Sequence, residues 1–160
     1  NDIIFVFHST KEHNELILTY VKNSGLVNCE VISDDKIKSH LLKKSIFAIA
    51  KSGTVSLEIS NVKIPSIILY KMNLINFLII KMLIKVKYAN IINISANEEI
   101  IPELLQSNCN PKNIYNVVSD FLDTPLKIEE QIKKTQVVLN KLKTEKSSSE
   151  LACNAINNLL

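Results

Sequence analysis

At residues 48–58 the chain reads Ala48-Ile49-Ala50-Lys51-Ser52-Gly53-Thr54-Val55-Ser56-Leu57-Glu58. The small and apolar residues from Ser45 to Ala50 are typical of a short covered strand, and Thr54 to Ile59 begin a helical pattern. One of the two glycines of the chain, Gly53, stands between them, where it lets the backbone turn tightly and approach a ligand closely. The stretch therefore predicts a strand, a tight turn and a helix, which is the repeating unit of an α/β fold.

The Ser52-Gly53-Thr54 turn is a candidate phosphate site. The first N–H groups of a helix lack intrahelical partners and point toward any bound anion. Glu58 follows one helical turn after Thr54, where a carboxylate can accept two hydrogen bonds from a sugar diol such as a ribose. The alternative is ordinary N-capping, which stabilises a helix by roughly 1 kcal/mol and implies no ligand. The turn alone leaves both interpretations open.

The composition is that of a globular domain with a real core. The chain has 160 residues, of which 46% are hydrophobic and 22% charged. A balance of 19 basic against 16 acidic residues gives a net charge of +3 and does not argue for nucleic acid as a partner. The three cysteines are far apart, so they indicate neither a disulfide framework nor a zinc site and fit a reducing cytosol. No acidic metal-binding cluster is visible, and we expect no metal and no cofactor.

Apolar runs alternate with helical patterns, which predicts a Rossmann-like parallel sheet with helices on both faces. The expected strands are Ile3 to Phe7, Val27 to Ile32, Ser45 to Ala50 and Ser66 to Tyr70, stacked in one sheet. The expected helices are Lys11 to Asn23, ended by Ser24-Gly25, then Asp35 to Lys44, begun by Asp34 and Asp35, and Thr54 to Ile59. In such sheets ligands bind outside the carboxyl ends of the strands, where the Ser-Gly-Thr turn lies.

The segment from Leu74 to Val86 is dominated by apolar residues with lysines interspersed. It is too short and too charged for a membrane span, which needs about 20 mainly apolar residues. One interpretation is a buried helix whose lysine stems reach solvent. The other is an interfacial helix that lies on an anionic membrane surface.

The C-terminal half of the chain is expected to contain one more short strand followed by helices. Tyr88 to Asn97 is interpreted as a short strand and Glu98 to Gln106 as the start of a helix. Asn93, between isoleucines, is the residue expected to point its amide into a site, and the alternative is a buried asparagine satisfied by backbone groups. The remaining expected elements are helices Lys112 to Leu122 and Pro125 to Lys143, a serine hinge at 147–149, and a terminal helix Glu150 to Leu160. We expect one domain at 1–123 and packing or dimerising helices at 124–160.

An ordered set of motifs carries a resemblance to a known family. The set is Ser52-Gly53-Thr54-x-x-Leu57-Glu58, then Pro65 before a strand ending in Tyr70-Lys71-Met72, then Tyr88 and Asn93, then Pro102-Glu103-Leu104-Leu105-Gln106. In this order and spacing the chain resembles the C-terminal half of lipid-A-disaccharide synthase, closely from Phe47 to Gln106 and more loosely outside.

The resemblance implies an inverting glycosyltransferase of the GT-B arrangement, in which two Rossmann-like halves face each other and the C-terminal half holds the nucleotide sugar. It implies transfer of 2,3-diacylglucosamine from UDP to a lipid monosaccharide phosphate, which forms the lipid A disaccharide. It also implies a cytoplasmic protein, peripheral on the inner face of the inner membrane of a Gram-negative bacterium.

Site roles follow from the resemblance residue by residue. Ser52, Gly53 and Thr54 would face the diphosphate, Glu58 the ribose hydroxyls, and Asn93 matches an asparagine that the family needs for activity. Three positions depart from the family pattern: Ile92 replaces a proline, Asn97 replaces a glycine, and Lys71 replaces an arginine at the donor site. Lysine keeps the positive charge but loses the bidentate fork of arginine. No catalytic base is identifiable.

Nothing in the chain resembles the N-terminal half of the family, and the chain begins without a secretory signal. We therefore expect a fragment or a split gene product that lacks its N-terminal half and does not catalyse transfer alone. A second hypothesis is a non-catalytic remnant that serves as a dimerisation or interaction module through its C-terminal helices. A third is an unrelated nucleotide-sugar enzyme of the same architecture.

Overall fold

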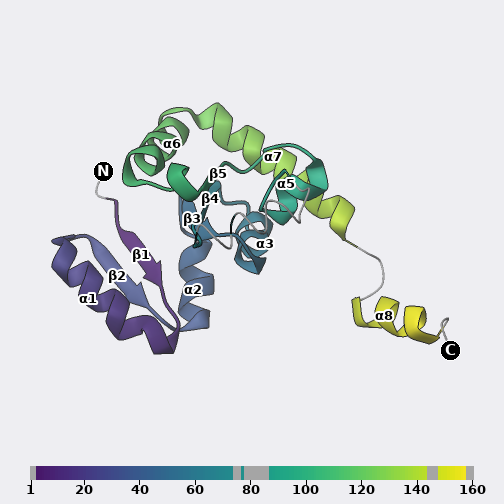
Figure 1. Cartoon of the computed structure of the whole chain (residues 1–160), viewed down its shortest axis with the longest axis horizontal. Helices are drawn as coiled ribbons and strands as arrows, with labels where there is room; N and C mark the ends of the chain where they lie inside the picture. Colours follow the sequence, from purple (N-terminus) through teal and green to yellow (C-terminus); the bar gives the residue numbers. More distant parts are fainter. Residues whose placement is uncertain (1–2, 74–76, 78–86, 144–147, 158–160) are drawn as a thin grey trace. The chain divides into compact units, whose positions relative to one another are not determined.

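The computed structural model describes residues 3–73, 77, 87–143 and 148–157 (Figure 1). It divides the chain into two compact units, Asn1–Ser45 and Ile46–Leu160. Each unit is an α/β arrangement of parallel strands with helices around them. The boundary expected at residue 123 falls between two helices of the second unit.

The first unit is built on two parallel strands, β1 (Phe5–His8) and β2 (Cys29–Ile32), which pair along their whole length. Between them lie the short 3-10 helix η1 (Lys11–His13) and α1 (Asn14–Ser24), and α2 (Asp35–Leu42) follows β2. This is a complete β-α-β unit, the arrangement that the alternation of apolar runs and helical patterns predicts.

The expected end of the first helix and the expected start of the second are confirmed by the local geometry, whereas α1 starts at Asn14 and α2 ends at Leu42. Gly25 follows α1 with φ 71°, the left-handed conformation that glycine adopts without a steric cost. The carboxylate of Asp34 accepts hydrogen bonds from the N–H groups of Lys36 at 2.7 Å and Ile37 at 3.1 Å. It therefore caps the N-terminus of α2.

The second unit contains a three-stranded parallel sheet in the order β3-β4-β5. Its strands are β3 (Ala48–Lys51), β4 (Ser66–Tyr70) and β5 (Glu103–Leu105), and helices α3 (Thr54–Asn61) and α5 (Ile91–Ala96) lie between them in the chain. The central strand β4 is the most buried of the three, because it pairs on both edges and is covered on its faces.

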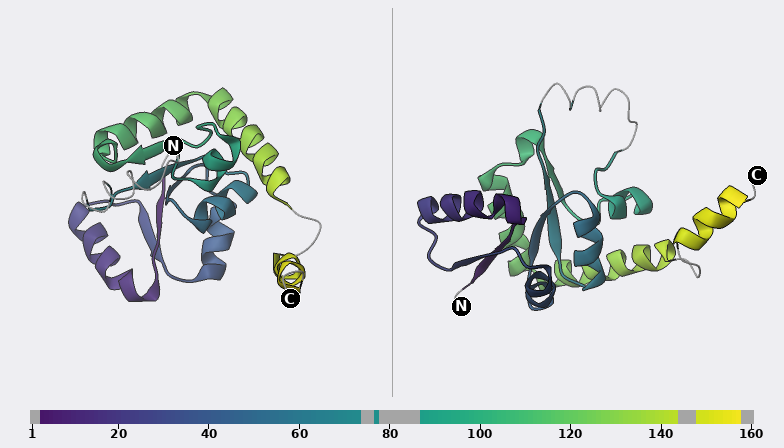
Figure 2. Two further views of the ribbon diagram at one scale, coloured as in Figure 1. Left: turned by 45° about the vertical axis from the view of Figure 1, so that its right-hand side comes forward. Right: turned by 90° about the horizontal axis from the view of Figure 1, so that it is seen from below.

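The C-terminal helices of the second unit are α6 (Pro111–Asp123), α7 (Pro125–Leu142) and α8 (Ser148–Asn157), and the 3-10 helix η2 (Gln106–Asn108) precedes them. Proline opens α6 and α7, as expected for a residue without an N–H group at the first helical position. Helix α7 packs against α3, α5 and α6, and Figure 2 shows it flanking the sheet.

The core of the second unit joins the sheet to α5 and α7. Its buried members are Ile68, Ile92, Ile100, Ile101 and Val138, with Ala50, Leu57, Ala96 and Leu139 packed around them. Each aliphatic side chain of this size contributes about 1.5–3 kcal/mol when it is fully buried. The core thus lies beside the strands whose carboxyl ends carry the candidate site.

Two segments have the opposite secondary structure from the one expected. Tyr88 to Asn97, expected as a strand, contains α5, and Glu98 to Gln106, expected as a helix start, contains β5. The reasons are local: the side chain of Asn90 accepts from the N–H of Ile92 at 2.8 Å and caps α5, while β5 pairs with the open edge of β4. Short apolar runs do not distinguish a buried strand from a buried helix.

The sequence predicts one sheet, and within each of the two units the structure pairs the strands as β1-β2 and β3-β4-β5. Both edges of β4 are taken by β3 and β5, and alternation along the sequence carries no information on which strands pair. The terminal helix begins at Ser148, inside the expected serine hinge. The expected helix 74–86 lies outside the described residues except for Phe77. None of the helices in the described ranges is long and apolar enough to cross a membrane.

Candidate functional site

The turn between β3 and α3 has a backbone conformation that requires glycine. Gly53 has φ 151° and ψ −164°, a region that residues with a side chain almost never adopt. A Cβ placed there would meet no atom of the described residues within 4 Å, so the constraint comes from the backbone and not from the space around it. Gly53 and Thr54 are exposed. Among the described residues, the turn is therefore exposed at the carboxyl end of β3.

The positive end of the α3 helix dipole lies at this turn. No acidic residue occurs in the first turn of α3, so the positive end of the helix dipole is not neutralised by a side chain of the helix itself. The Ser56 hydroxyl donates to the Gly53 carbonyl at 2.7 Å and fixes the turn from within. Glu58 lies one helical turn after Thr54 and is exposed. The expected strand, turn and helix are confirmed.

The next strand contributes Lys71 at the same edge of the sheet. Lys51 pairs with Leu69 in the β3–β4 register, so Lys71 follows the end of β4 beside the turn. Gln106 holds the following residue, since its side chain accepts from the Met72 N–H at 2.8 Å and donates to the Met72 carbonyl at 3.2 Å. The exposed side chain of Lys71 thus starts from a backbone segment that is fixed on its C-terminal side.

A hydrogen-bond network connects the turn to β5. The carboxylate of Glu103 accepts from the Ala89 N–H at 2.7 Å, the Asn90 N–H at 2.9 Å and the Asn93 side-chain amide at 2.8 Å. On the other side, the Ser52 hydroxyl donates to the Ala89 carbonyl at 2.7 Å. Ser52 is therefore joined to Glu103 through one peptide group.

Asn93 is fully buried and has all four of its hydrogen-bonding positions occupied. Its amide donates to the Ile101 carbonyl at 2.7 Å and to Glu103, and its carbonyl accepts from the Ile100 and Ile101 N–H groups, both at 2.9 Å. Asn93 cannot contact a reacting atom without losing one of these bonds. Its contacts hold the chain that leads into β5.

The structure thus gathers Ser52, Gly53, Thr54 and Lys71 at the carboxyl ends of adjacent strands, and it places Asn93 behind them in the core. Sequence reasoning assigned no role to Glu103, although the residue stands in the motif 102–106. The carboxylate oxygens of Glu103 accept from residues 10 to 14 positions earlier in the chain, and no periodic pattern in the sequence predicts such contacts.

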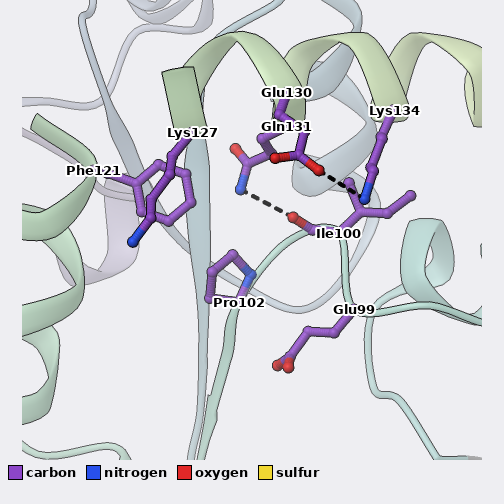
Figure 3. A pocket seen from close by; sticks show the side chains of 8 residues that line it. All are labelled: Glu99, Ile100, Pro102, Phe121, Lys127, Glu130, Gln131 and Lys134. Atoms are coloured by element: carbon purple, nitrogen blue, oxygen red, sulfur yellow. Dashed lines mark hydrogen bonds and ion pairs between the residues drawn. The ribbon is translucent and has the colours of Figure 1, made fainter. Parts of the chain in front are cut away.

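A separate shallow pocket lies between α7 and the segment before β5 (Figure 3). Gln131 points from α7 toward the sheet, where its side chain accepts from the Ser66 N–H at 2.7 Å and donates to the carbonyls of Ser66 at 3.0 Å and Ile100 at 3.3 Å. The polar groups of Gln131, Ser66 and Ile100 satisfy one another, so Gln131 serves the packing of α7 on the sheet.

An ion-pair cluster borders the same pocket. Lys134 of α7 contacts Glu98 at 2.6 Å and Glu130 at 2.9 Å. The hydrogen bond with Glu98, followed by that with Glu130, raises the pKa of Lys134 to about 12. The Lys134 ammonium in turn lowers the pKa of Glu130. Within the described ranges, His, Cys, Asp and Glu side chains form no group of three that could hold a metal ion.

Parallel strands, a glycine-dependent turn and a helix N-terminus at the strand ends place the chain among α/β proteins of Rossmann-like type, consistent with half of a GT-B glycosyltransferase. Residues 1–156 match the family described as Lipid-A-disaccharide synthetase. The chain belongs to this family.

Curated relatives agree with this assignment. The chain is 38% identical over 138 residues to a protein named lipid-A-disaccharide synthase from Rickettsia prowazekii, and the match covers 86% of the chain and 36% of the relative. It is 42% identical over 138 residues to the protein of this name from Rickettsia canadensis, covering 86% and 35%. The chain thus spans little more than a third of the length of these relatives.

Proposed function

We propose that this chain is the donor-binding part of a lipid-A-disaccharide synthase and holds the UDP portion of a nucleotide sugar at the Ser52-Gly53-Thr54 turn. The observation that carries the proposal is the conformation of Gly53 at the carboxyl end of β3, before a helix without an acid in its first turn. Such a turn exposes N–H groups to an anion, and the family membership supplies the class of anion.

Each donor-site residue has a proposed role. The N–H groups of Gly53 and Thr54 bind the diphosphate, and the Thr54 hydroxyl adds a donor. Lys71 supplies a positive charge from the neighbouring strand end, and Glu58 accepts hydrogen bonds from the ribose hydroxyls. Ser52 belongs to the same turn, and its hydroxyl proton holds the turn to Ala89.

The proposed reaction is transfer of 2,3-diacylglucosamine to a lipid monosaccharide phosphate. The acceptor hydroxyl attacks the anomeric carbon, a base takes its proton, and the bond to UDP breaks with the electron pair on the departing diphosphate. The turn stabilises that growing charge. We assign the base and the acceptor pocket to the part of the relatives that this chain does not cover, and the inner face of the inner membrane as the place of reaction.

Asn93, implied as catalytic by the resemblance, is proposed to act as a positioning residue. Its amide donates to Glu103, and its carbonyl holds the Ile100 and Ile101 N–H groups. Replacing Asn93 is therefore expected to disturb the donor site indirectly, through these contacts. This role requires no contact between Asn93 and the sugar.

Calorimetric titration of the chain with UDP tests the proposal. Wild type is expected to bind UDP saturably, and Thr54→Val and Glu58→Ala are each expected to weaken binding about ten-fold, the effect of one hydrogen bond to a charged group. Glu129→Ala is the matched control, because Glu129 is exposed on α7. A folded chain that does not bind millimolar UDP would refute the proposal.

The chain alone is expected to bind donor without turnover. Supplying both lipid substrates to the purified chain and following UDP release measures this directly. Disaccharide formation by the chain alone would show that the base lies within these 160 residues.

A dimerisation role is a second candidate, favoured by apolar side chains on the exposed side of α7. Leu126 is 74% exposed and Val137 51%, and their spacing of eleven residues places both on one side of the helix. We propose that a second copy of the chain covers them, which predicts a concentration-dependent dimer that UDP does not change. Sedimentation of wild type and of Val137→Lys measures this, and a monomer at every concentration would exclude it.

A further inference from the structure

The Ser52-Gly53-Thr54 turn is connected to the carboxylate of Glu103, to which the sequence motif assigned no role. Glu103 is the first residue of β5, and its half-buried side chain reaches α5 and the two residues before it. There it accepts three hydrogen bonds, from the N–H groups of Ala89 and Asn90 and from the Asn93 amide, at 2.7 to 2.9 Å. Hydrogen bonds to a charged acceptor are about twice as strong as neutral ones.

The peptide group between Ala89 and Asn90 is held on both sides. Its N–H donates to Glu103 at 2.9 Å, and its carbonyl accepts from the Ser52 hydroxyl at 2.7 Å. A donor bonded to a carboxylate polarises the peptide group, so the carbonyl becomes a better acceptor. The Ser52 hydroxyl proton is thereby directed toward Ala89.

We propose that Glu103 is a positioning residue that sets the Ser52-Gly53-Thr54 turn through the peptide group of Ala89 and Asn90. Ser52 immediately precedes Gly53. A contact that holds the Ser52 side chain therefore also holds the backbone on the N-terminal side of the strained glycine. The network leaves the N–H groups of the turn, and not the Ser52 hydroxyl, as the donors for an anion. The consequence for donor binding rests on the proposed function, whereas the coupling between Glu103 and the turn does not.

The test uses the full chain labelled with nitrogen-15, and compares amide signals of wild type, Glu103→Gln, Ser52→Ala and the double variant. Glutamine keeps the shape of the side chain but has only one acceptor oxygen. Its amide N–H groups would face the N–H groups that donate to Glu103 in the wild type. Glu103→Gln is expected to shift the Gly53 and Thr54 amides in the same direction as Ser52→Ala, and the double variant is expected to add nothing. Glu129→Gln is the control and is expected to leave them unchanged.

The two proposals fail separately. If Gly53 and Thr54 stay unshifted in Glu103→Gln while the Ala89 and Asn90 amides move, the positioning role is overturned, whatever UDP does. If wild type does not bind UDP but the amides are coupled, only the donor-site proposal fails. Where UDP binds, the effects of the two substitutions on affinity are expected to be non-additive, and additive effects would contradict the positioning role.

A variant that does not fold does not end the test. Ser52→Ala probes the network from its other end, because it removes the donor to the peptide group whose N–H faces Glu103. It is expected to shift the Asn90 amide and the side-chain amide of Asn93. An Asn93 signal that does not respond would overturn the connection through Glu103.

Discussion

At the scale of single residues, the backbone conformation of Gly53 shapes the turn of the candidate site. Its φ of 151° and ψ of −164° predict that Gly53→Ala loses about 1–3 kcal/mol of stability through backbone strain alone, since no neighbouring atom would clash. Urea unfolding measures this. Gly25→Asn is the control, because Gly25 has φ 71°, which asparagine tolerates. Equal losses in both variants would contradict the argument.

Asn93 gives the second prediction at this scale. Asn93→Ala removes the acceptor of two buried N–H groups, so a loss of about 2–6 kcal/mol is expected, from roughly 1–3 kcal/mol for each unsatisfied group. Asn140→Ala, on the exposed side of α7, is expected to change stability by less than about 0.5 kcal/mol. Urea unfolding of both variants is the measurement, and a tolerated Asn93→Ala would refute the buried role.

Residue types at the turn were predictable, and their connections were not. A glycine between an apolar run and a helical pattern indicates a tight turn because few residues adopt such a backbone. Whether Asn93 points into a site or into the core depends on Ile100, Ile101 and Glu103, which fold back on it. Both possibilities were open from sequence, and the structure shows the buried one.

At the scale of elements, Gln131 fixes α7 to the centre of the sheet. Gln131→Met keeps the length of the side chain but leaves the Ser66 N–H without its acceptor in a buried place, which predicts a loss of about 1–3 kcal/mol. Lys133→Met is the control, because Lys133 is exposed on the same helix. Thermal unfolding of the two variants is compared, and indistinguishable melting temperatures would show that α7 docks without this contact.

The ion pairs of Lys134 make a small contribution to stability that depends on pH. The folded pKa of about 12 exceeds the ordinary value of 10.5, so this contribution is complete below 10.5 and is lost as pH rises through 12. The pKa of Glu130 is lowered from its ordinary value of 4.5. The contribution of Glu130 to stability is therefore complete above pH 4.5 and is lost as the pH falls through the folded pKa. The melting difference between wild type and Lys134→Gln is therefore expected to shrink at both extremes. Lys141→Gln is the control, and a difference independent of pH would exclude the ion pairs as its cause.

Elements were predictable where local signals agree. Asp34 at a helix start, Gly25 at a helix end and prolines opening α6 and α7 all stand where expected. The exchange between α5 and β5 arose because both segments are short and apolar, and β5 has only three residues. Such a strand exists because the edge of β4 is open to it, which is a property of the sheet and not of the segment.

At the scale of the whole molecule, the fold class and the family follow from the sequence, whereas the strand pairing does not. The repeating β-α pattern and the ordered motifs from Ser52 to Gln106 predicted an α/β chain of this family. The division into sheets β1-β2 and β3-β4-β5 depends on contacts between segments far apart in sequence. The family match and the site geometry together make the donor site the central claim.

The most direct measurement of that claim is a map of the amide signals that UDP shifts in the full chain. A donor site at the turn predicts the largest shifts at Gly53 and Thr54, with a smaller shift at Lys71 and none at Gln131 in the pocket beside α7. Shifts centred on Gln131 and its neighbours, with the Gly53 and Thr54 signals unchanged at saturating UDP, would contradict it.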